Sequence, residues 1–395
     1  MYIVHLGFSG FPTGNATIQR IRFTFKAIAS AGFIPLIINK TSNLASVPYK
    51  KKANRFDGLL FVYTSASITR PKSFAKRNFN KLGGFVSELR LLYKRRRKID
   101  SAILYTPYFS ELLYYRVLSK LLGFKLVIQY VEFRSQIPDR TSLFTKLNDK
   151  LFDSYCYKFC DGVIVISEFL KNHVEKKNKN LPTIKIPAIC DFRDFEIIPA
   201  AKLDYKYFLY CGTVSYLPVI HFVIEFFEKA KDQKLYDGKL MCIIGGTSSE
   251  NFDSIEDAIK SNKYARDIIL YKNLPYNNII PLYKSADLLL IPLRNSIQDI
   301  ARFPHKVSEY SASARPLISS KIGELDYYFK DKDSALLADE YDVDKYIATL
   351  AEMQSQNISF EEIGKKGYNV GYNNFHYESN VAAIKKFFNS LSVGR

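Results

Sequence analysis

The sequence predicts an α/β protein with two doubly wound parallel sheets, each in a domain of its own. Three observations lead to this prediction. The chain has 395 residues, more than one hydrophobic core comfortably serves, which favours two domains. Apolar strands alternate with helical segments along most of the sequence, a pattern typical of parallel sheets covered by helices. The alternation stops and restarts around Pro182, Pro187 and Pro199, which bracket a linker between two folding units.

The first half alternates strand and helix from its beginning. Residues 2–7 form an apolar strand, and a turn at 10–14 leads into an amphipathic helix over 17–31. Gly32 directly after this helix is a typical C-cap, because glycine readily takes the left-handed backbone conformation. The expected later elements of this half are strands at 34–38, 58–62, 102–105, 125–130 and 162–166, and helices at 111–122 and 143–160.

The second half repeats this pattern. Its expected elements are strands at 207–211, 239–245, 268–271, 288–293 and 317–319, and helices at 218–231 and 306–314. A closing helix over 379–391 is expected to pack back across the first domain. The predicted domains are therefore residues 1–199 and 200–375, followed by a C-terminal segment of residues 376–395.

The bulk composition is that of an ordinary globular protein, with 47% hydrophobic and 24% charged residues. Its apolar runs are too short or too interrupted by charge to predict a membrane-spanning helix. The strand at 2–7 leaves no room for a signal peptide, so a cytoplasmic location is expected. No metal site or cofactor is expected, because the cysteines lack zinc-type spacing and are best explained as buried thiols: Cys156, Cys160, Cys190, Cys211 and Cys242.

Basic residues are concentrated in the first half of the chain. Residues 1–199 contain 33 Lys or Arg against 14 Asp or Glu, whereas residues 200–395 contain 24 against 25. Within this half, residues 70–98 hold eleven basic residues and one acid, with apolar residues between them at helical spacing. This pattern favours an amphipathic helix at an anionic membrane surface, on the inner face of the membrane.

Two alternatives to a membrane surface remain for residues 70–98. One is a solvated basic face over an ordinary core contact. The other is a nucleic-acid-binding surface, which would need aromatic rings on the basic face for base stacking. The aromatic residues of this segment instead follow the apolar stripe. No nucleic-acid partner is therefore expected.

The most informative segment begins at residue 302 and reads Arg-Phe-Pro-His-Lys-Val-Ser-Glu-Tyr. It follows an apolar strand and a polar loop, and its second part is a predicted helix. Glu309, one turn into this helix at the carboxyl edge of a parallel sheet, is placed to accept hydrogen bonds from ribose hydroxyls. Arg302 and Lys306 can meet phosphate charge. The plain alternative is a surface glutamate on an ordinary helix.

This segment resembles the nucleotide-sugar motif of family 4 glycosyltransferases, in its Arg-Phe-Pro-x-Lys-x-x-Glu-Tyr form. The resemblance implies the GT-B fold, in which two Rossmann-like domains face a cleft, over nearly the whole chain. It implies that Glu309 holds the donor ribose and that the short helix after Pro304 presents its N-terminus to the diphosphate. The commoner family pattern has a second glutamate eight positions earlier, where this sequence has Ala301.

Glycine-rich loops after two strands suggest further donor contacts. The loop after the first strand includes Gly10, Gly14 and Asn15 and opens onto a helix, so its backbone N–H groups can approach an anion. By resemblance, this loop lies near the donor diphosphate, with Asn15 towards the acceptor side; a tight turn is the alternative. Its spacing does not match a dinucleotide-binding fingerprint, which argues against a dehydrogenase.

The corresponding loops of the second domain also match the family in part. Gly245 and Gly246 resemble the strand-end glycines beside the nucleotide, and Gly212 and Thr213 begin the loop after the first strand of that domain. Family members often carry an Arg and a Lys in this last loop. Residues 212–218 contain neither, so the resemblance leaves Arg302 and Lys306 as the cations for the diphosphate.

Three polar residues complete the candidate site. Glu132, just past an apolar strand, can orient an acceptor hydroxyl or steady positive charge at the anomeric carbon, or it can simply pair with Arg134. Asp191 matches a recurring family aspartate near the cleft. Ser167 is expected to cap the helix that follows it.

The sequence therefore predicts a glycosyltransferase that moves a sugar from a nucleotide-diphosphate sugar to a hydroxyl acceptor. By resemblance it retains anomeric configuration, needs no metal and takes a saccharide or lipid-linked acceptor, as in bacterial surface polysaccharide or glycolipid assembly. The alternatives are a nucleotide-sugar 2-epimerase of the same fold, a basic nucleic-acid-binding protein, and a sugar-binding protein without activity.

Overall fold

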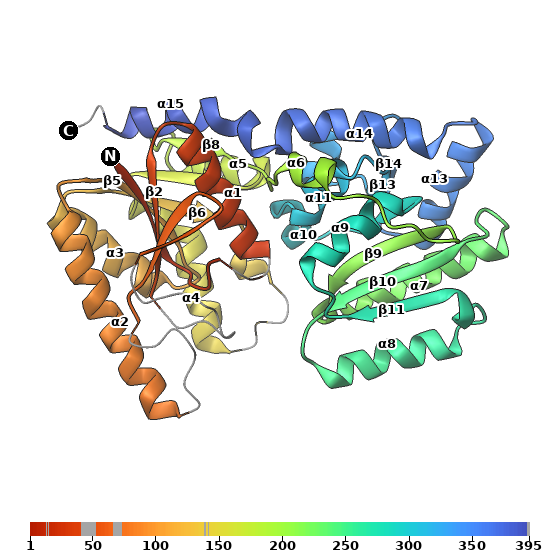
Figure 1. Ribbon diagram of the computed structural model, residues 1–395, viewed down its shortest axis with the longest axis horizontal. Helices are drawn as coiled ribbons and strands as arrows, with labels where there is room; N and C mark the ends of the chain where they lie inside the picture. Colours follow the sequence, from red (N-terminus) through yellow and green to blue (C-terminus); the bar gives the residue numbers. More distant parts are fainter. Residues whose placement is uncertain are drawn as a thin grey trace. The chain divides into compact units, whose positions relative to one another are not determined.

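The structure is a computed structural model that describes residues 1–12, 14, 16–40, 53–65, 73–137, 140 and 142–392. The chain forms two compact units. Unit 1 consists of Met1–Ile189, Ala301–Phe303 and Tyr377–Arg395, and unit 2 consists of Cys190–Ile300 and Pro304–His376. Each unit contains one sheet with helices packed on it (Figure 1).

The sheet of unit 1 has eight strands in the order β3-β4-β2-β1-β5-β6-β7-β8. All neighbours are parallel except β3 and β4, which are antiparallel. The four central residues of β1 are fully buried, as expected for a strand covered on both faces. The strands are β1 (Tyr2–Gly7), β2 (Ile34–Asn39), β3 (Asn54–Phe56), β4 (Leu59–Tyr63), β5 (Ile99–Tyr105), β6 (Lys125–Tyr130), β7 (Gly162–Val165) and β8 (Thr183–Lys185).

Helices of unit 1 connect these strands, and α1 packs against α15 whereas α3 packs against α4. Their bounds are α1 (Ala16–Ser30), α2 (Phe74–Arg95), α3 (Phe109–Leu122), α4 (Leu143–Tyr155), α5 (Glu168–Lys177) and α15 (Val381–Ser392), with 3-10 turns η1 (Arg134–Gln136), η2 (Cys156–Lys158) and η5 (Tyr377–Asn380).

The sheet of unit 2 is parallel throughout, in the order β11-β10-β9-β12-β13-β14. Its strands are β9 (Tyr207–Thr213), β10 (Lys239–Gly245), β11 (Ile268–Lys272), β12 (Leu288–Leu290), β13 (Leu317–Ser320) and β14 (Leu336–Ala338). Its helices are α6 (Phe192–Ile197), α7 (Leu217–Asp232), α8 (Ser249–Ser261), α9 (Tyr276–Ser285), α10 (Ile297–Ala301), α11 (His305–Ala312), α12 (Gly323–Tyr328), α13 (Val343–Ser355) and α14 (Phe360–Phe375), with turns η3 (Val214–Tyr216) and η4 (Ala265–Asp267). The last residue of α10, Ala301, is grouped with unit 1.

The predicted fold class is confirmed, since each unit is a largely parallel sheet covered by helices. The unit boundary, however, falls after Ile189 rather than after residue 199. The physical reason is that the segment after Ile189 bonds within unit 2. The Cys190 amide donates to the Phe375 carbonyl at 3.0 Å, and Lys284 Nζ donates to the carbonyl oxygens of Phe195 and Ile198.

The last helix, α15, belongs to unit 1 and closes part of its core. The rings of Phe33 and Phe388 meet edge to face, with centroids 5.6 Å apart. Gly162 at the start of β7 leaves room for Phe387, whose ring atom would lie 2.9 Å from a Cβ at that position. In the part of the chain that the structure describes, no helix has the length and apolar character needed to cross a membrane.

Candidate functional site

Helix α11 carries the predicted ribose ligand, and small residues hold this helix close to α14. Gly371 of α14 leaves only 2.4 Å between a would-be Cβ and Ser311 Cβ, so a larger residue there would push the helices apart. As a result Glu309 is buried inside unit 2, at 4% exposure, rather than lying on an outer surface.

Two tyrosines of α9 hold the Glu309 carboxylate. Tyr276 and Tyr283 hydrogen-bond it, and His305 Nε2 lies 3.5 Å from Glu309 Oε1. Burial raises the pKa of Glu309 to about 6, although the positive charge of Lys306 and the two tyrosines act to lower it. Glu309 is therefore an acceptor that is ionised at neutral pH and already aligned. Neither tyrosine belongs to a motif that is recognisable in the sequence.

The start of the β9 loop lies beside this carboxylate. The Cys211 amide donates to the Tyr310 hydroxyl at 3.3 Å, which ties the end of β9 to α11. The positive charge of Lys306 acts on both Glu309 and Cys211, so this lysine of α11 lies near both the carboxylate and the end of β9. Gly212 follows directly, and Thr213 forms a hydrogen bond with Ser215, Oγ1 to Oγ at 2.8 Å.

The predicted glycine pair, Gly245 and Gly246, lies at the same edge of the sheet. Gly245 is in register with Thr213, so the ends of β9 and β10 lie side by side. Asn273 fixes the turn after β10, because its side chain accepts from the Gly246 amide at 2.8 Å and donates to the Gly246 carbonyl at 3.0 Å. Four of the predicted donor residues of unit 2 are thus gathered at the carboxyl ends of its strands: Gly212, Thr213, Gly245 and Gly246.

We expect Gly246→Ala to lower the free energy of unfolding by about 2 kcal/mol. Gly246 has a φ of +143°, and an added Cβ would lie 2.4 Å from Val214 Cγ1. Gly245→Ala is the matched control, because its Cβ would meet nothing nearer than 3.9 Å. Denaturant unfolding of the two variants checks this, and equal loss in both would contradict the steric argument.

The 302–306 segment is divided between the two units. Arg302 belongs to unit 1, together with Ala301, whose carbonyl accepts from Ser167 Oγ at 2.5 Å. Pro304 and Lys306 belong to unit 2, where Pro304 precedes α11 as its N-cap residue. Of the two predicted phosphate-binding cations, unit 2 therefore contains Lys306 and unit 1 contains Arg302.

A further cation, which the sequence did not predict, lies in the polar loop after β12. Arg294 Nε donates to Asp299 Oδ2 at 3.0 Å, and Asp299 is 1% exposed. This hydrogen bond raises the pKa of Arg294. The signal in the sequence is a single arginine directly after an apolar strand.

The glycine loop of unit 1 is anchored by Asn39 at the end of β2. Its Oδ1 accepts from the amides of Gly10, at 3.0 Å, and Phe11, at 3.2 Å. Gly14 is exposed and precedes α1. Asn15, the remaining predicted residue of this loop, lies outside the described residues.

Glu132 follows β6 in unit 1, and its side chain is 44% exposed. Its nearest cation is Arg134, with Nη2 3.7 Å from Glu132 Oε2, a distance too long for a hydrogen bond. The carboxylate also acts on Tyr105, whose pKa is raised mainly by burial and then by Glu132. Glu132 therefore forms a long ion pair with Arg134 rather than a hydrogen bond, and much of its side chain stays exposed.

Two residues that the sequence singled out, Ser167 and Asp191, cap helices in the structure. Ser167 Oγ accepts from the Leu170 amide at 3.2 Å, which confirms the expected cap of α5. Asp191 lies in unit 2, where it caps α6 and forms an ion pair with Arg193 (Oδ1 to Nε, 3.0 Å). These contacts give Asp191 a structural explanation within its own unit.

A charged cluster inside unit 1 was not predicted. Lys40 Nζ donates to Glu111 Oε1 and, at 3.2 Å, to the Tyr115 hydroxyl. Tyr115 in turn donates to Glu88 Oε2 at 2.9 Å. Glu88 is fully buried in α2, and this burial raises its pKa to about 7. Among the residues that the structure describes, no group of three or more His, Cys, Asp or Glu could hold a metal ion.

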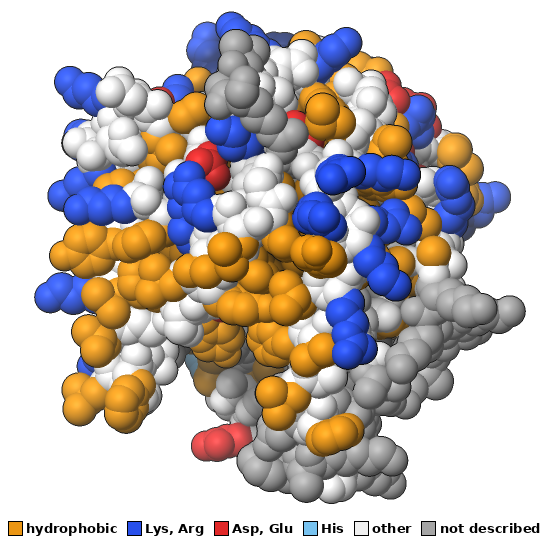
Figure 2. All heavy atoms as spheres, turned by 90° about the vertical axis from the view of Figure 1, so that its left-hand side faces the viewer, with side chains coloured by type: hydrophobic (Ala, Val, Ile, Leu, Met, Phe, Trp, Pro, Cys, Tyr) orange, Lys and Arg blue, Asp and Glu red, His pale blue; other side chains and the backbone are white. Residues whose placement is uncertain are grey.

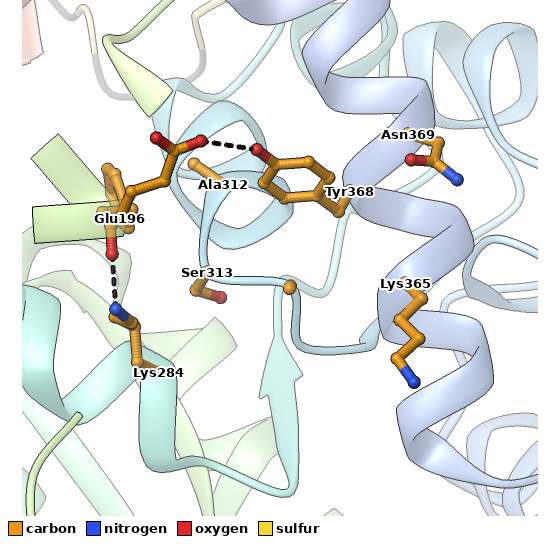
Figure 3. A pocket seen from close by; sticks show the side chains of 9 residues that line it. Glu196, Lys284, Ala312, Ser313, Lys365, Tyr368 and Asn369 are labelled. Atoms are coloured by element: carbon orange, nitrogen blue, oxygen red, sulfur yellow. Dashed lines mark hydrogen bonds between the residues drawn. The ribbon is translucent and has the colours of Figure 1, made fainter. Parts of the chain in front are cut away.

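Unit 2 also has a pocket of about 520 Å³ that contains none of the predicted site residues. It lies at the C-terminal end of α11, lined by Ala312 and Ser313, whereas Lys306 lies in the first turn of this helix and Glu309 in its middle. Figure 3 shows Tyr368 of α14 donating to the Glu196 carboxylate, at 3.1 Å, across this pocket.

Comparison with known proteins identifies the fold. The model of the family Glycosyl transferases group 1 matches residues 191–370. Sucrose-phosphate synthase from Thermosynechococcus elongatus has a similar structure, with a TM-score of 0.75, 15% identity and complete coverage of both chains. Anabaena HepE in complex with UDP-glucose gives a TM-score of 0.68 at 12% identity, again over both whole chains.

The catalytic domain of starch synthase IV from Arabidopsis thaliana, bound to ADP and acarbose, also has a TM-score of 0.68. It is 13% identical and covers 100% of this chain and 99% of its own. A search of curated protein sequences finds no match. The chain thus has the GT-B fold of glycosyltransferases, and the group 1 glycosyl transferase family matches its second unit.

Proposed function

We propose that this protein transfers a hexose from a nucleotide-diphosphate sugar to a hydroxyl acceptor, with retention of anomeric configuration and without a metal. The observation that carries the proposal is the buried Glu309, held by two tyrosines within the segment that the group 1 family matches. A carboxylate with this support can accept hydrogen bonds from both hydroxyls of a ribose.

The proposed donor contacts follow from the sheet edge of unit 2. Glu309 receives the ribose hydroxyls, and Lys306 meets the diphosphate charge. The glycine backbone at 212 and 245–246 allows close approach of the nucleotide. In the reaction, the bond between the anomeric carbon and the diphosphate breaks, a bond to the acceptor oxygen forms, and the acceptor proton passes to the departing diphosphate.

Unit 1 is proposed to supply the acceptor side. Glu132, exposed at the carboxyl end of β6, is placed to orient an acceptor hydroxyl. Gly10 and Gly14 follow β1 at the same edge of the sheet, and their loop is proposed to approach the donor diphosphate rather than the acceptor. The resemblance to family 4 enzymes supports these roles and the proposal that the chain acts in bacterial surface polysaccharide or glycolipid assembly, in the cytoplasm at the inner face of the membrane.

One structural relative is consistent with that setting. The lipopolysaccharide outer core galactosyltransferase WaaB in its apo form has a TM-score of 0.61 at 15% identity, over 100% of this chain and 99% of its own. The basic excess of residues 1–199 is a second argument, because it favours contact with anionic lipid.

A thermal-shift panel of UDP, GDP and ADP sugars, followed by product analysis, tests the proposal. A donor at one hundred times its dissociation constant adds about 2.7 kcal/mol to the free energy of unfolding. Transfer to an acceptor, with activity unchanged by EDTA, is expected. An epimer formed from donor alone would support an epimerase instead. Stabilisation without any turnover would indicate a sugar-binding protein, for which the argument is Ala301 in place of the second glutamate of the family pattern.

A further inference from the structure

A cavity of about 630 Å³ opens in unit 1 just after Glu132, where β6 passes through η1 into α4. Four cationic side chains line it, and one acid: Arg134, Arg140, Lys146, Lys150 and Asp149. Its volume is within the usual range of small-molecule sites. The excess of positive charge indicates an anionic ligand.

Among the residues that the structure describes, only one of these four cations has a carboxylate within hydrogen-bond distance. Arg140 Nη1 lies 2.8 Å from Asp149 Oδ2, and Asp149 is 1% exposed, so this pair neutralises itself. Arg134 is 8% exposed, and its nearest acid is Glu132 at 3.7 Å. Lys146 and Lys150 are exposed and have no carboxylate partner within the described ranges of the chain.

A buried arginine suits phosphate when it shares a cavity with two lysines that have no carboxylate partner among the described residues. The planar Arg134 guanidinium can donate two parallel hydrogen bonds to phosphate oxygens, and the lysines add mobile positive charge. A neutral saccharide would gain little from three cations. The cavity is therefore better matched to an acceptor that carries a phosphate or diphosphate than to an uncharged one.

Exposed apolar residues stand next to this cavity on the same helix. In the first turns of α4, Leu143 is 82% exposed, Phe144 87% and Leu147 57%. Helix α3, which packs against α4, exposes Val117 and Leu121 as well. Exposure of such a group of large apolar side chains to water is unfavourable, so we expect a binding partner to cover them.

The same combination continues on α2. Figure 2 shows hydrophobic side chains gathered on the face of unit 1 that carries this helix, with Lys and Arg around them. The apolar members on α2 are Phe79, Leu82, Val86, Leu89 and Tyr93. Apolar side chains bordered by cations fit the boundary between lipid tails and anionic head groups.

We propose that this cavity binds the phosphate of a lipid-linked saccharide while Leu143, Phe144 and Leu147 enter the bilayer beside it. The lipid phosphate would lie against Arg134, Lys146 and Lys150, which places the attached saccharide near Glu132. The proposal rests on the proposed function for the role of the bound lipid, but the binding itself needs no donor. It names the acceptor class that the sequence left open.

Vesicle co-sedimentation of the full chain tests this proposal. The vesicles are phosphatidylcholine alone, phosphatidylcholine with phosphatidylglycerol, and phosphatidylcholine with polyprenyl phosphate at equal surface charge. We expect the tightest binding to polyprenyl phosphate. The double variant K146Q/K150Q should lose about thirtyfold in that binding, since each cation near an anionic surface contributes about fivefold.

Matched variants separate local from general effects. K176Q/K177Q removes two exposed lysines from the end of α5 and should retain most of the binding. F144S should weaken binding to all three vesicles, whereas I197S, at an 80% exposed position of α6, should not. Inorganic phosphate and pyrophosphate serve as soluble probes in a thermal-shift measurement.

Several results would overturn the proposal. Equal binding to phosphatidylglycerol and polyprenyl phosphate would mean that no head-group site exists. Equal losses in K146Q/K150Q and K176Q/K177Q would mean that the cavity is not involved. Stabilisation by soluble phosphate without any preference among vesicles would exclude the lipid source. Vesicle binding without sugar transfer would defeat the proposed function only, and transfer to a soluble acceptor without vesicle preference would defeat this inference only.

Discussion

Replacement of Glu309 by alanine is expected to remove the thermal stabilisation that a nucleotide-diphosphate sugar gives the wild-type protein. The carboxylate would otherwise accept hydrogen bonds from ribose hydroxyls, and each bond to a charged group is worth about 1.5–3 kcal/mol. Loss of two such bonds lowers the affinity by about 3 kcal/mol or more, a factor of at least about 150. Isothermal calorimetry with the best donor of the panel measures this.

The control for this prediction must separate binding from folding. Glu309→Ala leaves Tyr276 and Tyr283 without their acceptor, so the apo variant is compared with the wild type by circular dichroism. Glu309→Gln keeps the size of the side chain and one acceptor oxygen, and should lose affinity while remaining folded. Glu361→Gln, at an exposed position of α14, should bind as the wild type does. Unchanged affinity in both Glu309 variants would show that this residue does not hold the ribose.

Donor affinity should also depend on pH. Burial raises the pKa of Glu309 to about 6, and the ionised carboxylate is the stronger acceptor for ribose hydroxyls. Affinity should therefore fall as the pH drops below about 6. The phosphates of a nucleotide-diphosphate sugar lack the monoester dissociation near pH 6, so the ligand does not titrate in this range. Affinity measured from pH 5 to pH 8 checks this, and Glu309→Gln should give a flat profile.

Replacement of Glu88 by glutamine is expected to stabilise the protein at pH 8 by up to about 3 kcal/mol. Burial raises the pKa of Glu88 from 4.5 to about 7, so the folded protein holds this proton more tightly than the unfolded chain does. The resulting stabilisation is complete below pH 4.5 and is lost as the pH rises to about 7. Glutamine cannot ionise, and its oxygen can still accept from Tyr115.

Denaturant unfolding at pH 5 and pH 8 tests the Glu88 prediction. The gain from Glu88→Gln should be largest at pH 8 and small at pH 5, where wild-type Glu88 is protonated. Glu340→Gln removes the same charge at an exposed position and should change the stability little at either pH. A gain that is equal at both pH values would contradict the assignment to Glu88 ionisation.

Features that depend on local pattern were predictable from the sequence. The parallel sheets follow from apolar strands such as residues 2–7 and 239–245, because strands covered on both faces are apolar throughout. The burial of Glu309 beside a sheet edge follows from its place in a short helix after an apolar strand and a polar loop. Ser167 is recognisable as a cap because a serine precedes a helical pattern.

Features that depend on contacts between distant residues were not predictable. Tyr276 and Tyr283 reach Glu309 from α9. This helix is hard to recognise in the sequence because it contains Pro281, a residue that usually interrupts helices. Lys40 meets Glu111 although 71 positions separate them. The cation-lined cavity beside α4 depends equally on how the chain turns after β6. Contacts between residues far apart in the sequence are set by tertiary packing, and local hydrophobic periodicity does not predict them.

Unit 1 takes its residues from both ends of the sequence, whereas most of unit 2 lies between Ile189 and Tyr377. During synthesis on the ribosome, all of unit 2 therefore emerges before α15. Domains usually mature in order from the N-terminus, but here the later unit can complete its core first. Until α15 has been synthesised, Phe388 cannot cover Phe33, so the apolar surface around Phe33 stays exposed on the nascent chain.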